Sequence, residues 1–447
     1  MQSISIINKT TQSTSHNTPS EIKKSMRIIA GKAAGICYMA DDYLSDGIQD
    51  ELKAIKRAIG TAKSGHYSVF EHGHLSFLIN TSKMMAMVLN SMGLYSTSEK
   101  SARYTAMKPN TELEAELYNK WKYKFAELIT PYYEGKYDEK DIEKLAMENA
   151  RYMLSVFTPT VLEYTLPYNR AVLMVYWLKN FALNINSLVW DNKENIYKKH
   201  CYFYEKLSTE AAELANILAE TIGVTDDDPV LVDHKNIGID FIRTVGYITK
   251  LDFKYDNTVV LDTDRLYKES IRDDLYGDVY ISNYQASFAE VAQAERHRTL
   301  HHYIDLPDKL EIYVPKIIRG SAYEIEWKND FERLINENII PQGTLLDVTE
   351  SGRFEDFVLK CKERLCSRAQ LEIMEVTREQ VAKFAYNYDN LCNMNKALLD
   401  NMIRQTDDVN YKKHDTIIVE SRCKFSGYTC KEPCKIANDT INYYRNI

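Results

Sequence analysis

The hydropathy pattern along the chain predicts a mixture of helices and strands. Between Ile48 and Lys63 the apolar residues Leu52, Ile55, Ala58 and Ile59 recur at helical spacing. The stretch HGHLSFLIN instead alternates apolar and polar residues, as a half-buried strand does. The stretch SKMMAMVLNSMGL then places Met84, Val88 and Leu89 on one face of a helix. Because both periods occur close together, we predict an α+β fold in which a mixed sheet carries flanking helices.

The same pattern divides the chain into four parts. The first 20 residues are rich in Ser, Thr, Asn and Gln, and we predict that they are disordered. The run Asp226–Pro229 is predicted to be a linker, because strand-like and helix-like stretches begin again after it. We therefore expect a tail at 1–20, one domain at 21–225, a second domain at 230–385 and a helical, cysteine-containing appendage at 386–447.

Composition limits the partners of the chain. Of its 447 residues, 45% are hydrophobic, which is enough for sizeable cores. A formal net charge of −8 gives no global attraction for nucleic acid, so a small phosphorylated ligand in a local basic pocket fits better than DNA. The longest apolar run, 171–178, is too short to cross a bilayer, and the polar start lacks the features of a secretory signal. We expect a cytoplasmic protein without a membrane partner.

The chain contains eight cysteines, of which Cys423, Cys430 and Cys434 fall close together. Three thiolates, with His414 or Cys392 as a fourth ligand, would suit zinc. Their spacing lacks a paired Cys-x-x-Cys, so we predict reduced cysteines and no metal site, with zinc as the alternative.

One short basic stretch has no obvious structural reason. In AQAERHRTLHH the side chains of Arg296, His297 and Arg298 are adjacent, and all three can donate hydrogen bonds to a polyanion. In a helix, Gln293, Arg296 and His297 would share one face, because they are spaced three and four residues apart. A solvated basic patch is the alternative interpretation.

Two stretches of the first half carry further polar groups. GHYSVFEHGHLSF brings imidazole, hydroxyl and carboxylate groups to the start of the predicted strand, which suits a polar cofactor or an ordinary hydrogen-bonded loop. In STSEKSARY a Ser lies two residues before an Arg, which favours phosphate binding if the chain is extended, with an ordinary surface loop as the alternative. The polar residues singled out are His66, Ser68 and Glu71 in the first stretch and Glu99, Ser101 and Arg103 in the second.

Together these stretches resemble the signature of the flavin-dependent thymidylate synthases, the ThyX type. That signature joins His-x-Ser/Thr-x-x-Glu-His, a strand, an Arg-His-Arg triad and, after seven intervening residues, a Ser in a Ser-x-Arg-Tyr context. The chain contains it twice, each time in part. The first half has HYSVFEH and SARY but the run Ser91–Gly93 in place of the triad, whereas the second half has the triad and Gln293 but Leu306 in place of the Ser.

Three further resemblances follow the same division. In the first half, ENARYML places Arg151 on a phosphate-binding Arg of the family, and PYNRA places Asn169, with two residues inserted, on a flavin-contacting Asn. In the second half, KERLCSRAQLEI places Arg364 on another nucleotide-binding Arg. The losses in the two halves are complementary, and the family's active site forms between subunits. We therefore expect an internal duplication whose degenerate halves share one composite site.

The resemblance implies both an architecture and an activity. Two tandem domains would form an intrachain pseudo-dimer, and two chains would form a homodimer that corresponds to the family's tetramer. The expected reaction is the reductive methylation of dUMP to dTMP, with FAD as cofactor and NADPH and methylenetetrahydrofolate as co-substrates. The implied roles are catalysis by Arg296, Arg298 and Ser101, flavin binding by His66, Ser68, Glu71, Asn169 and His297, and dUMP binding by Glu99, Ser101, Arg103, Arg151, Gln293 and Arg364.

Departures from the family pattern leave two alternatives open. His301 and His302 follow the triad where the family has small and polar residues, and Lys83 stands where the family commonly has Arg. One alternative is therefore an altered modification at pyrimidine C5, such as dUMP hydroxymethylation. The other is a non-catalytic flavin- or nucleotide-binding homologue in which both halves have decayed.

Overall fold

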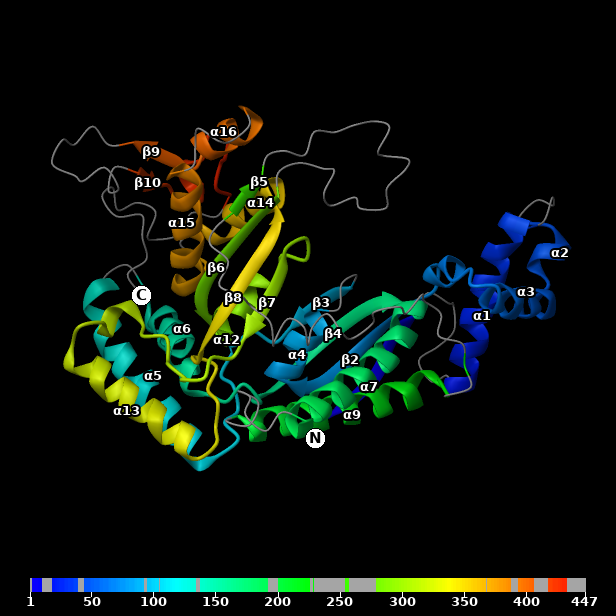
Figure 1. Ribbon diagram of the computed structural model, residues 1–447, viewed down its shortest axis with the longest axis horizontal. Coiled ribbons are helices and arrows are strands. Elements are labelled where there is room, and N and C mark those ends of the chain that lie inside the picture. The colour runs from blue at the N-terminus through cyan, green and yellow to red at the C-terminus, as the bar shows by residue number, and fades with distance from the viewer. Residues whose placement is uncertain are drawn as a thin grey trace. The chain divides into compact units, whose positions relative to one another are not determined.

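The computed structural model contains two compact units, each built from two separate stretches of the chain (Figure 1). Unit 1 comprises residues 1–101 and 157–243, and unit 2 comprises residues 102–156 and 244–447. Within these units the structure describes residues 2–9, 18–38, 44–91, 95–103, 105–133, 137–191, 200–225, 228, 254–256, 279–366, 368–386, 393–405 and 417–431.

Unit 1 is organised around a four-stranded antiparallel sheet in the order β1-β2-β4-β3. Helices α7 and α9 lie side by side, and the Ser208 hydroxyl of α9 donates a hydrogen bond to the Ala182 carbonyl of α7 at 3.0 Å (Figure 1). The elements of unit 1 are β1 (Ser3–Lys9), α1 (Pro19–Tyr38), α2 (Asp46–Gln49), α3 (Glu51–Lys63), η1 (Ser68–Glu71), β2 (His74–Ser82), α4 (Lys83–Asn90), β3 (Ser96–Glu99), β4 (Pro159–Pro167), α7 (Tyr168–Asp191) and α9 (Cys201–Ile222).

The predicted strand and helix at the centre of unit 1 are confirmed. Strand β2 ends at Ser82, whose hydroxyl accepts a hydrogen bond from the Met85 N–H at 3.1 Å and so caps α4. Met84, Val88 and Leu89 are buried, as their helical spacing predicts.

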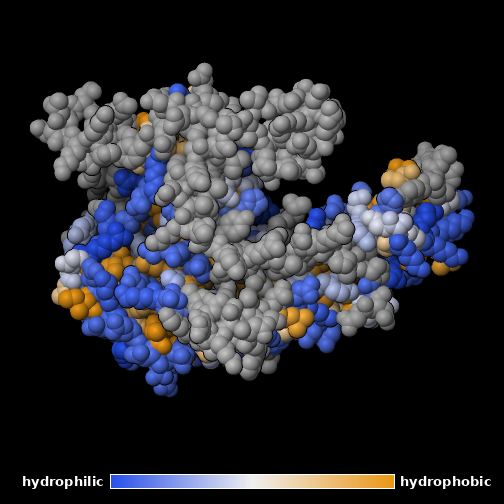
Figure 2. Space-filling model, viewed as in Figure 1, coloured by the Kyte–Doolittle hydropathy of each residue, from blue (hydrophilic) through white to orange (hydrophobic). Residues whose placement is uncertain are grey.

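The outer helices of unit 1 pack through small residues. Leu52 and Ile59 of α3 are exposed, and the buried side of this helix is formed instead by Ala54, Ala58 and Ala62. Figure 2 shows that the surface around α1, α2 and α3 is mostly hydrophilic with small hydrophobic groups. Alanine and glycine allow the two long helices α1 and α3 to approach closely, which larger side chains would prevent.

Unit 2 contains a second four-stranded antiparallel sheet, in the order β5-β6-β8-β7, and a separate hairpin of β9 and β10. Its elements are α5 (Glu112–Tyr133), α6 (Glu139–Ala150), η2 (Arg151–Met153), β5 (Lys254–Asp256), β6 (Val279–Ser287), α12 (Phe288–Ala294), β7 (His301–Asp305), η4 (Lys316–Ile318), α13 (Ala322–Asn336), β8 (Leu345–Arg353), α14 (Phe354–Arg364), α15 (Leu371–Tyr386), α16 (Asn393–Asp400), β9 (Ile403–Gln405), β10 (Ile417–Val419) and η6 (Arg422–Lys424).

Two aromatic clusters hold unit 2 together. Trp121 of α5 meets Trp327 of α13 edge-on with ring centroids 4.7 Å apart, which fixes these helices to one another. A second cluster surrounds Phe354 and includes Met402 and Val419. The segment expected to be a separate appendage at 386–447 therefore contributes to the core of unit 2, because its apolar side chains complete this cluster.

The two sheets repeat one arrangement. Strands β2 and β4, like β6 and β8, pair over nine residues, so that His74–Ser82 corresponds to Val279–Ser287. The edge strands correspond as well, because Ser96 of β3 and His301 of β7 each pair with the residue six positions beyond the start of β4 and β8. Ser287 also repeats the cap of α4, since its hydroxyl accepts from the N–H of the third residue of α12.

Two sequence-based expectations differ from the structure. The tail at 1–20 was predicted to be disordered from its polar composition, yet Ser3–Lys9 forms β1, because its backbone pairs with the edge of β2. The expected first domain, 21–225, also includes Ala102–Val156, which the structure places with unit 2. In the described part of the chain, no helix has both the length and the apolar content needed to span a bilayer.

Candidate functional site

The Arg-His-Arg stretch of unit 2 lies in turns between α12 and β7. Helix α12 ends at Ala294, and the His297 N–H donates a hydrogen bond to the Ala294 carbonyl at 2.9 Å. The prediction that Gln293, Arg296 and His297 share one helical face is therefore wrong, because the chain must leave the helix to enter β7. Arg298 is exposed, whereas Arg296 and His297 are half-buried.

Arg364 at the end of α14 holds His297 in place. Its Nε donates to His297 Nε2 at 2.8 Å, and its Nη2 donates to the Gln293 carbonyl at 3.0 Å. Burial, followed by the positive charge of Arg364, lowers the pKa of His297 to about 3. Three residues singled out from the second half of the sequence thus form one connected group.

Gln370 joins this group to the first half of the sequence. Its Oε1 accepts hydrogen bonds from both Arg151 Nη2 and Gln293 Nε2, and its amide nitrogen donates to the Tyr152 hydroxyl. Arg151 has only 6% of its surface exposed, and its Nε has no hydrogen-bond partner among the described residues. A buried donor of this kind is available to an anionic ligand.

We call the hydrogen bonds that Gln370 makes to Arg151, Gln293 and Tyr152 the Gln370 junction. Glu372 binds Tyr152 next to this junction. Its carboxylate accepts hydrogen bonds from the Ser287 N–H and hydroxyl, both at 2.7 Å, and from the Tyr152 hydroxyl at 2.8 Å. Burial raises the pKa of this carboxyl group. Neither Gln370 nor Glu372 was predicted from the sequence, although both lie in the AQLEI run that follows Arg364.

Arg103 brings a further guanidinium group to unit 2. Its Nε donates to Glu148 at 2.6 Å and its Nη2 to the Arg368 carbonyl at 2.5 Å. Burial lowers the pKa of Arg151 and of Arg364, and the positive charge of Arg103 lowers both further. The charge of Arg296 acts on Arg364 in the same direction. We call Arg103, Arg151, Arg296 and Arg364 the arginine cluster; their mutual repulsion favours binding of an anion.

A carboxyl group that the sequence reasoning missed lies beside this cluster. Glu290 of α12 is fully buried, and neither of its carboxyl oxygens has a hydrogen-bond partner among the described residues. Burial raises its pKa to about 8, against the opposing charges of Lys360 and Arg364. A Glu on a helix is almost never fully buried, so the sequence offered no signal for it.

Lys360 and Glu350 form a buried ion pair close to Glu290. Lys360 Nζ lies 2.6 Å from Glu350 Oε2, and both side chains are fully buried. His302 Nε2 lies 3.1 Å from the same oxygen. Glu350 and Lys360 correspond to Tyr164 and Met174 in the repeated arrangement of unit 1, so the buried charges distinguish unit 2.

The candidate flavin-binding residues of unit 1 surround the start of β2. His66, Ser68 and Glu71 are exposed on the turn and the η1 helix. Asn169 of α7 is buried and donates to Glu71 Oε1 at 3.3 Å, while its own Oδ1 has no hydrogen-bond partner among the described residues. Arg170 Nη2 lies 3.7 Å from the same Glu71 oxygen. This donor and acceptor set suits a polar cofactor.

Glu99 and Ser101 lie at the end of β3 in unit 1. The Glu99 carboxylate accepts hydrogen bonds from Lys83 Nζ at 2.6 Å and from the Thr160 hydroxyl at 3.2 Å, so it is already paired within the sheet. Ser101 is half-buried two residues further on. The pairing anchors the segment that carries Ser101.

The cysteine stretch is described only in part. Cys423 and Cys430 are half-buried, and Cys434 lies outside the described residues, as do His414 and Cys392. Among the residues that the structure describes, no group of three or more His, Cys, Asp or Glu side chains is arranged to hold a metal ion.

Comparison with known proteins identifies one family. Residues 19–169 match the family described as "Thymidylate synthase complementing protein". This range includes HYSVFEH, SARY, ENARYML and the Asn169 position. No match is found among curated proteins.

Several solved structures are similar to parts of the chain. One is thymidylate synthase X (ThyX) from Helicobacter pylori with FAD and dUMP, at 17% identity over 52% of this chain and 99% of that chain, with a TM-score of 0.27. Another is the UMP/dUMP methylase PolB from Streptomyces cacaoi bound with 5-Br dUMP, at 17% identity over 38% of this chain and 75% of that chain, with a TM-score of 0.25.

Proposed function

Because residues 19–169 belong to the thymidylate synthase complementing protein family, we propose that the chain is a cytoplasmic, flavin-dependent thymidylate synthase that converts dUMP to dTMP. The observation that carries the proposal is the Gln370 junction. Its single Oε1 accepts from Arg151, which comes from the first half of the sequence, and from Gln293, which comes from the second. Residues expected to complement one another across the two halves thus share one acceptor.

The arginine cluster would bind the substrate. Guanidinium groups donate in a planar fork that matches phosphate, which suits Arg103, Arg151 and Arg364 for the dUMP phosphate. The half-buried Arg296 and the exposed Arg298 would polarise the pyrimidine carbonyls through fixed positive charge. The remaining substrate residues are Gln293, Ser101 and Glu99, the last anchored by Lys83.

The FAD-binding residues that the family resemblance implies come from both halves of the sequence. His66, Ser68 and Glu71 offer exposed polar groups, and the unpartnered Oδ1 of the buried Asn169 fits a donor of the cofactor. His297 would contact the flavin as a neutral imidazole. Bound FAD, reduced by NADPH, would supply hydride while methylenetetrahydrofolate provides the one-carbon unit.

The repeated sheet supports an internal duplication. By the register of the edge strands, Ser101 corresponds to Leu306. Counting back along the sequence from the same register sets positions 91–93, of which 92 and 93 lie outside the described residues, against Arg296–Arg298. Each half therefore keeps what the other lacks at the equivalent position, as a shared composite site requires. Two such chains would form the homodimer that takes the place of the family's tetramer.

Purified protein tests the proposal directly. We expect a yellow protein that takes up FAD and bleaches with NADPH. With dUMP and methylenetetrahydrofolate it should yield a nucleotide heavier than dUMP by one CH2 unit in mass spectrometry. A hydroxymethyl product would instead identify an altered modification at C5. A protein that neither takes up FAD nor binds dUMP would contradict the proposal.

A further inference from the structure

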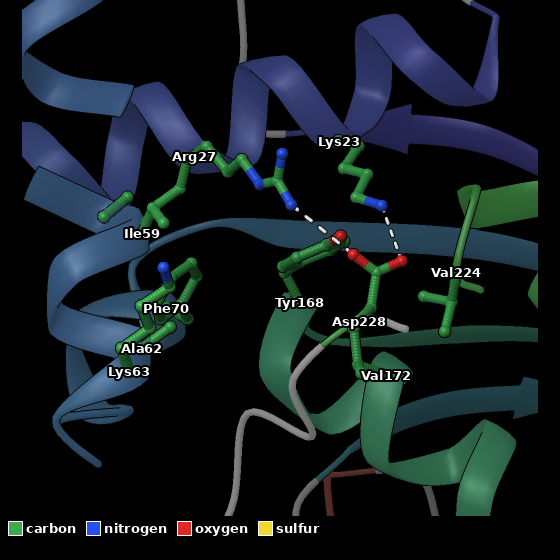
Figure 3. Close-up of a pocket in the computed structure, with 11 residues that line it drawn as sticks. Lys23, Arg27, Ile59, Ala62, Lys63, Phe70, Tyr168, Val172, Val224 and Asp228 are labelled. Atoms are coloured by element: carbon green, nitrogen blue, oxygen red, sulfur yellow. Dashed lines mark hydrogen bonds and ion pairs between the residues drawn. The ribbon is translucent and has the colours of Figure 1, made fainter. Parts of the chain in front are cut away.

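Unit 1 contains a cavity of about 310 Å³ that shares no residue with the proposed FAD and dUMP sites. Its lining comes from α1, α3, η1, the start of α7 and the segment that follows α9 (Figure 3). This volume is at the lower end of the range for small-molecule pockets.

Asp228, the carboxylate in the cavity lining, is bound mainly by Lys23 and by its own loop. Lys23 Nζ lies 2.5 Å from Asp228 Oδ2 and also donates to the Gly223 carbonyl at 3.3 Å. The same Asp228 oxygen accepts from the Thr225 N–H at 2.8 Å and from its hydroxyl at 3.0 Å. Lys23 and Asp228 therefore neutralise each other, and Asp228 is held by its own loop.

Three other polar side chains at the cavity have hydrogen-bond donors that no described residue uses. Arg27 makes a single hydrogen bond in the described structure, 3.4 Å from Nη2 to Asp228 Oδ1, although a guanidinium carries five N–H groups. Lys63 forms no ion pair with a described residue. Tyr168 is only 3% exposed, and its hydroxyl, beside Asp228 in Figure 3, has no hydrogen bond to any described residue. A hydroxyl that lines a cavity and has no protein partner can donate a hydrogen bond to a ligand.

The walls of the cavity are apolar. Figure 3 shows Phe70 on one side and Val172 on the other, with the Arg27 side chain reaching in from α1 above them. Apart from the Lys23–Asp228 pair, the lining carries the two positive charges of Arg27 and Lys63. A flat apolar group between the walls and an anionic group on the cations would satisfy both features.

We propose that this cavity binds a small anion with a flat apolar body, such as an aromatic carboxylate or an aromatic phosphate ester. Arg27 and Lys63 bind the anionic group, and the Tyr168 hydroxyl donates to it. The ring lies between Phe70 and Val172. None of the residues proposed for FAD or dUMP lines this cavity, so the proposal does not depend on the proposed function.

Calorimetric titration of the full chain with phenyl phosphate and with benzoate tests the proposal and separates the two anion types. We expect at least one of them to bind with one site per chain and at least tenfold more tightly than inorganic phosphate or phenol. Inorganic phosphate lacks the flat apolar body of the proposed ligand, and phenol lacks its anionic group. Excess dUMP and FAD should leave this binding unchanged, which distinguishes the cavity from the arginine cluster.

Three variants locate the binding. Arg27→Gln, Lys63→Gln and Tyr168→Phe should each weaken it at least fivefold, while Lys56→Gln, an exposed lysine on the same helix as Lys63, should leave it unchanged. Circular dichroism confirms that each variant is folded. Equal affinity for phenyl phosphate, benzoate and inorganic phosphate, loss of binding on addition of dUMP or FAD, or cavity variants that behave like Lys56→Gln would each overturn the proposal.

Discussion

Arg364 donates a hydrogen bond from its Nε to Nε2 of His297 at 2.8 Å. Arginine remains protonated at all accessible pH values, so His297 must accept this bond with an unprotonated Nε2. The imidazole of the Arg-His-Arg stretch is therefore neutral and carries its proton on Nδ1. It offers a ligand one donor between two permanently charged neighbours.

The first prediction is that Arg364→Met raises the pKa of His297. The pKa of about 3 results from burial, then from the positive charge of Arg364, so removal of that charge should move it at least one unit toward the ordinary value of 6.5. NMR titration of histidine-labelled protein measures the change. Arg319→Met, which removes an arginine paired with Glu375 in the same unit, is the control and should leave His297 unaffected. An unchanged His297 pKa in Arg364→Met would show that Arg364 does not set it.

The second prediction concerns the buried Glu290, whose pKa rises from 4.5 to about 8 on folding. Between these pH values the folded chain keeps a proton on Glu290 that the unfolded chain has lost. This group alone therefore lowers the free energy of unfolding by about 1.4 kcal/mol for each pH unit gained across the window. Glu290→Gln removes this dependence, so the variant should be more stable than the wild type by a margin that grows from pH 5 to pH 8.

Urea unfolding at several pH values measures that margin. Other buried carboxyl groups, such as Glu372, are present in both proteins and cancel in the difference. Glu332→Gln, at an exposed position of α13, is the matched control and should show no margin that grows with pH. A constant difference between Glu290→Gln and the wild type would mean that Glu290 is ionised in the folded protein.

Local periodicity predicted those helices and strands in which the buried residues follow one regular spacing along the sequence. Strand β2 and helix α4 were predicted because their apolar residues alternate and then recur at helical spacing. The same reasoning predicted helix α3 and the burial of Ala58 correctly, but Leu52 and Ile59 are exposed, since close helix packing selects size as well as polarity. Strand β1 was not predicted because its composition is polar, and it is held by backbone pairing to β2.

The site was predictable only where a motif marked it. Arg151, Gln293 and Arg364 were singled out one by one, and the structure brings them together through Gln370 and hydrogen bonds to one another. No sequence pattern tells which distant residues share an acceptor. The end of α12 at Ala294 was also invisible, because a helical period does not show where the helix must stop for the chain to enter β7.

The third prediction follows from a composite site. Arg103 and Arg298 lie in different halves of the sequence. Nevertheless, Arg103→Ala and Arg298→Ala should each lower the rate of dTMP formation about 100-fold or more, because each removes a fixed cationic donor. Steady-state assays with saturating FAD measure the loss. Arg333→Ala removes an arginine that pairs with Glu116 on the surface of unit 2, and it should retain the wild-type rate. Substantial activity in either Arg103→Ala or Arg298→Ala would contradict one shared site.

The fourth prediction compares two glycines of the helices α1 and α3. A Cβ on Gly31 of α1 would lie 1.8 Å from the Ala54 carbonyl oxygen, and the Gly31 carbonyl itself accepts a hydrogen bond from Arg57 Nε at 2.9 Å. Gly31→Ala must therefore push the two helix backbones apart, and we expect it to lower the free energy of unfolding by about 3 kcal/mol or more. Urea unfolding followed by circular dichroism measures the loss.

Gly60 of α3 provides the matched control, because a Cβ there would meet nothing within 4 Å. Gly60→Ala should raise the free energy of unfolding by about 0.5–1 kcal/mol, since alanine loses less backbone entropy than glycine in a helix. The two substitutions add the same methyl group to helices of the same unit, so opposite signs isolate the close approach of α1 to α3. If Gly31→Ala were as stable as Gly60→Ala, the helices could not be packed this closely.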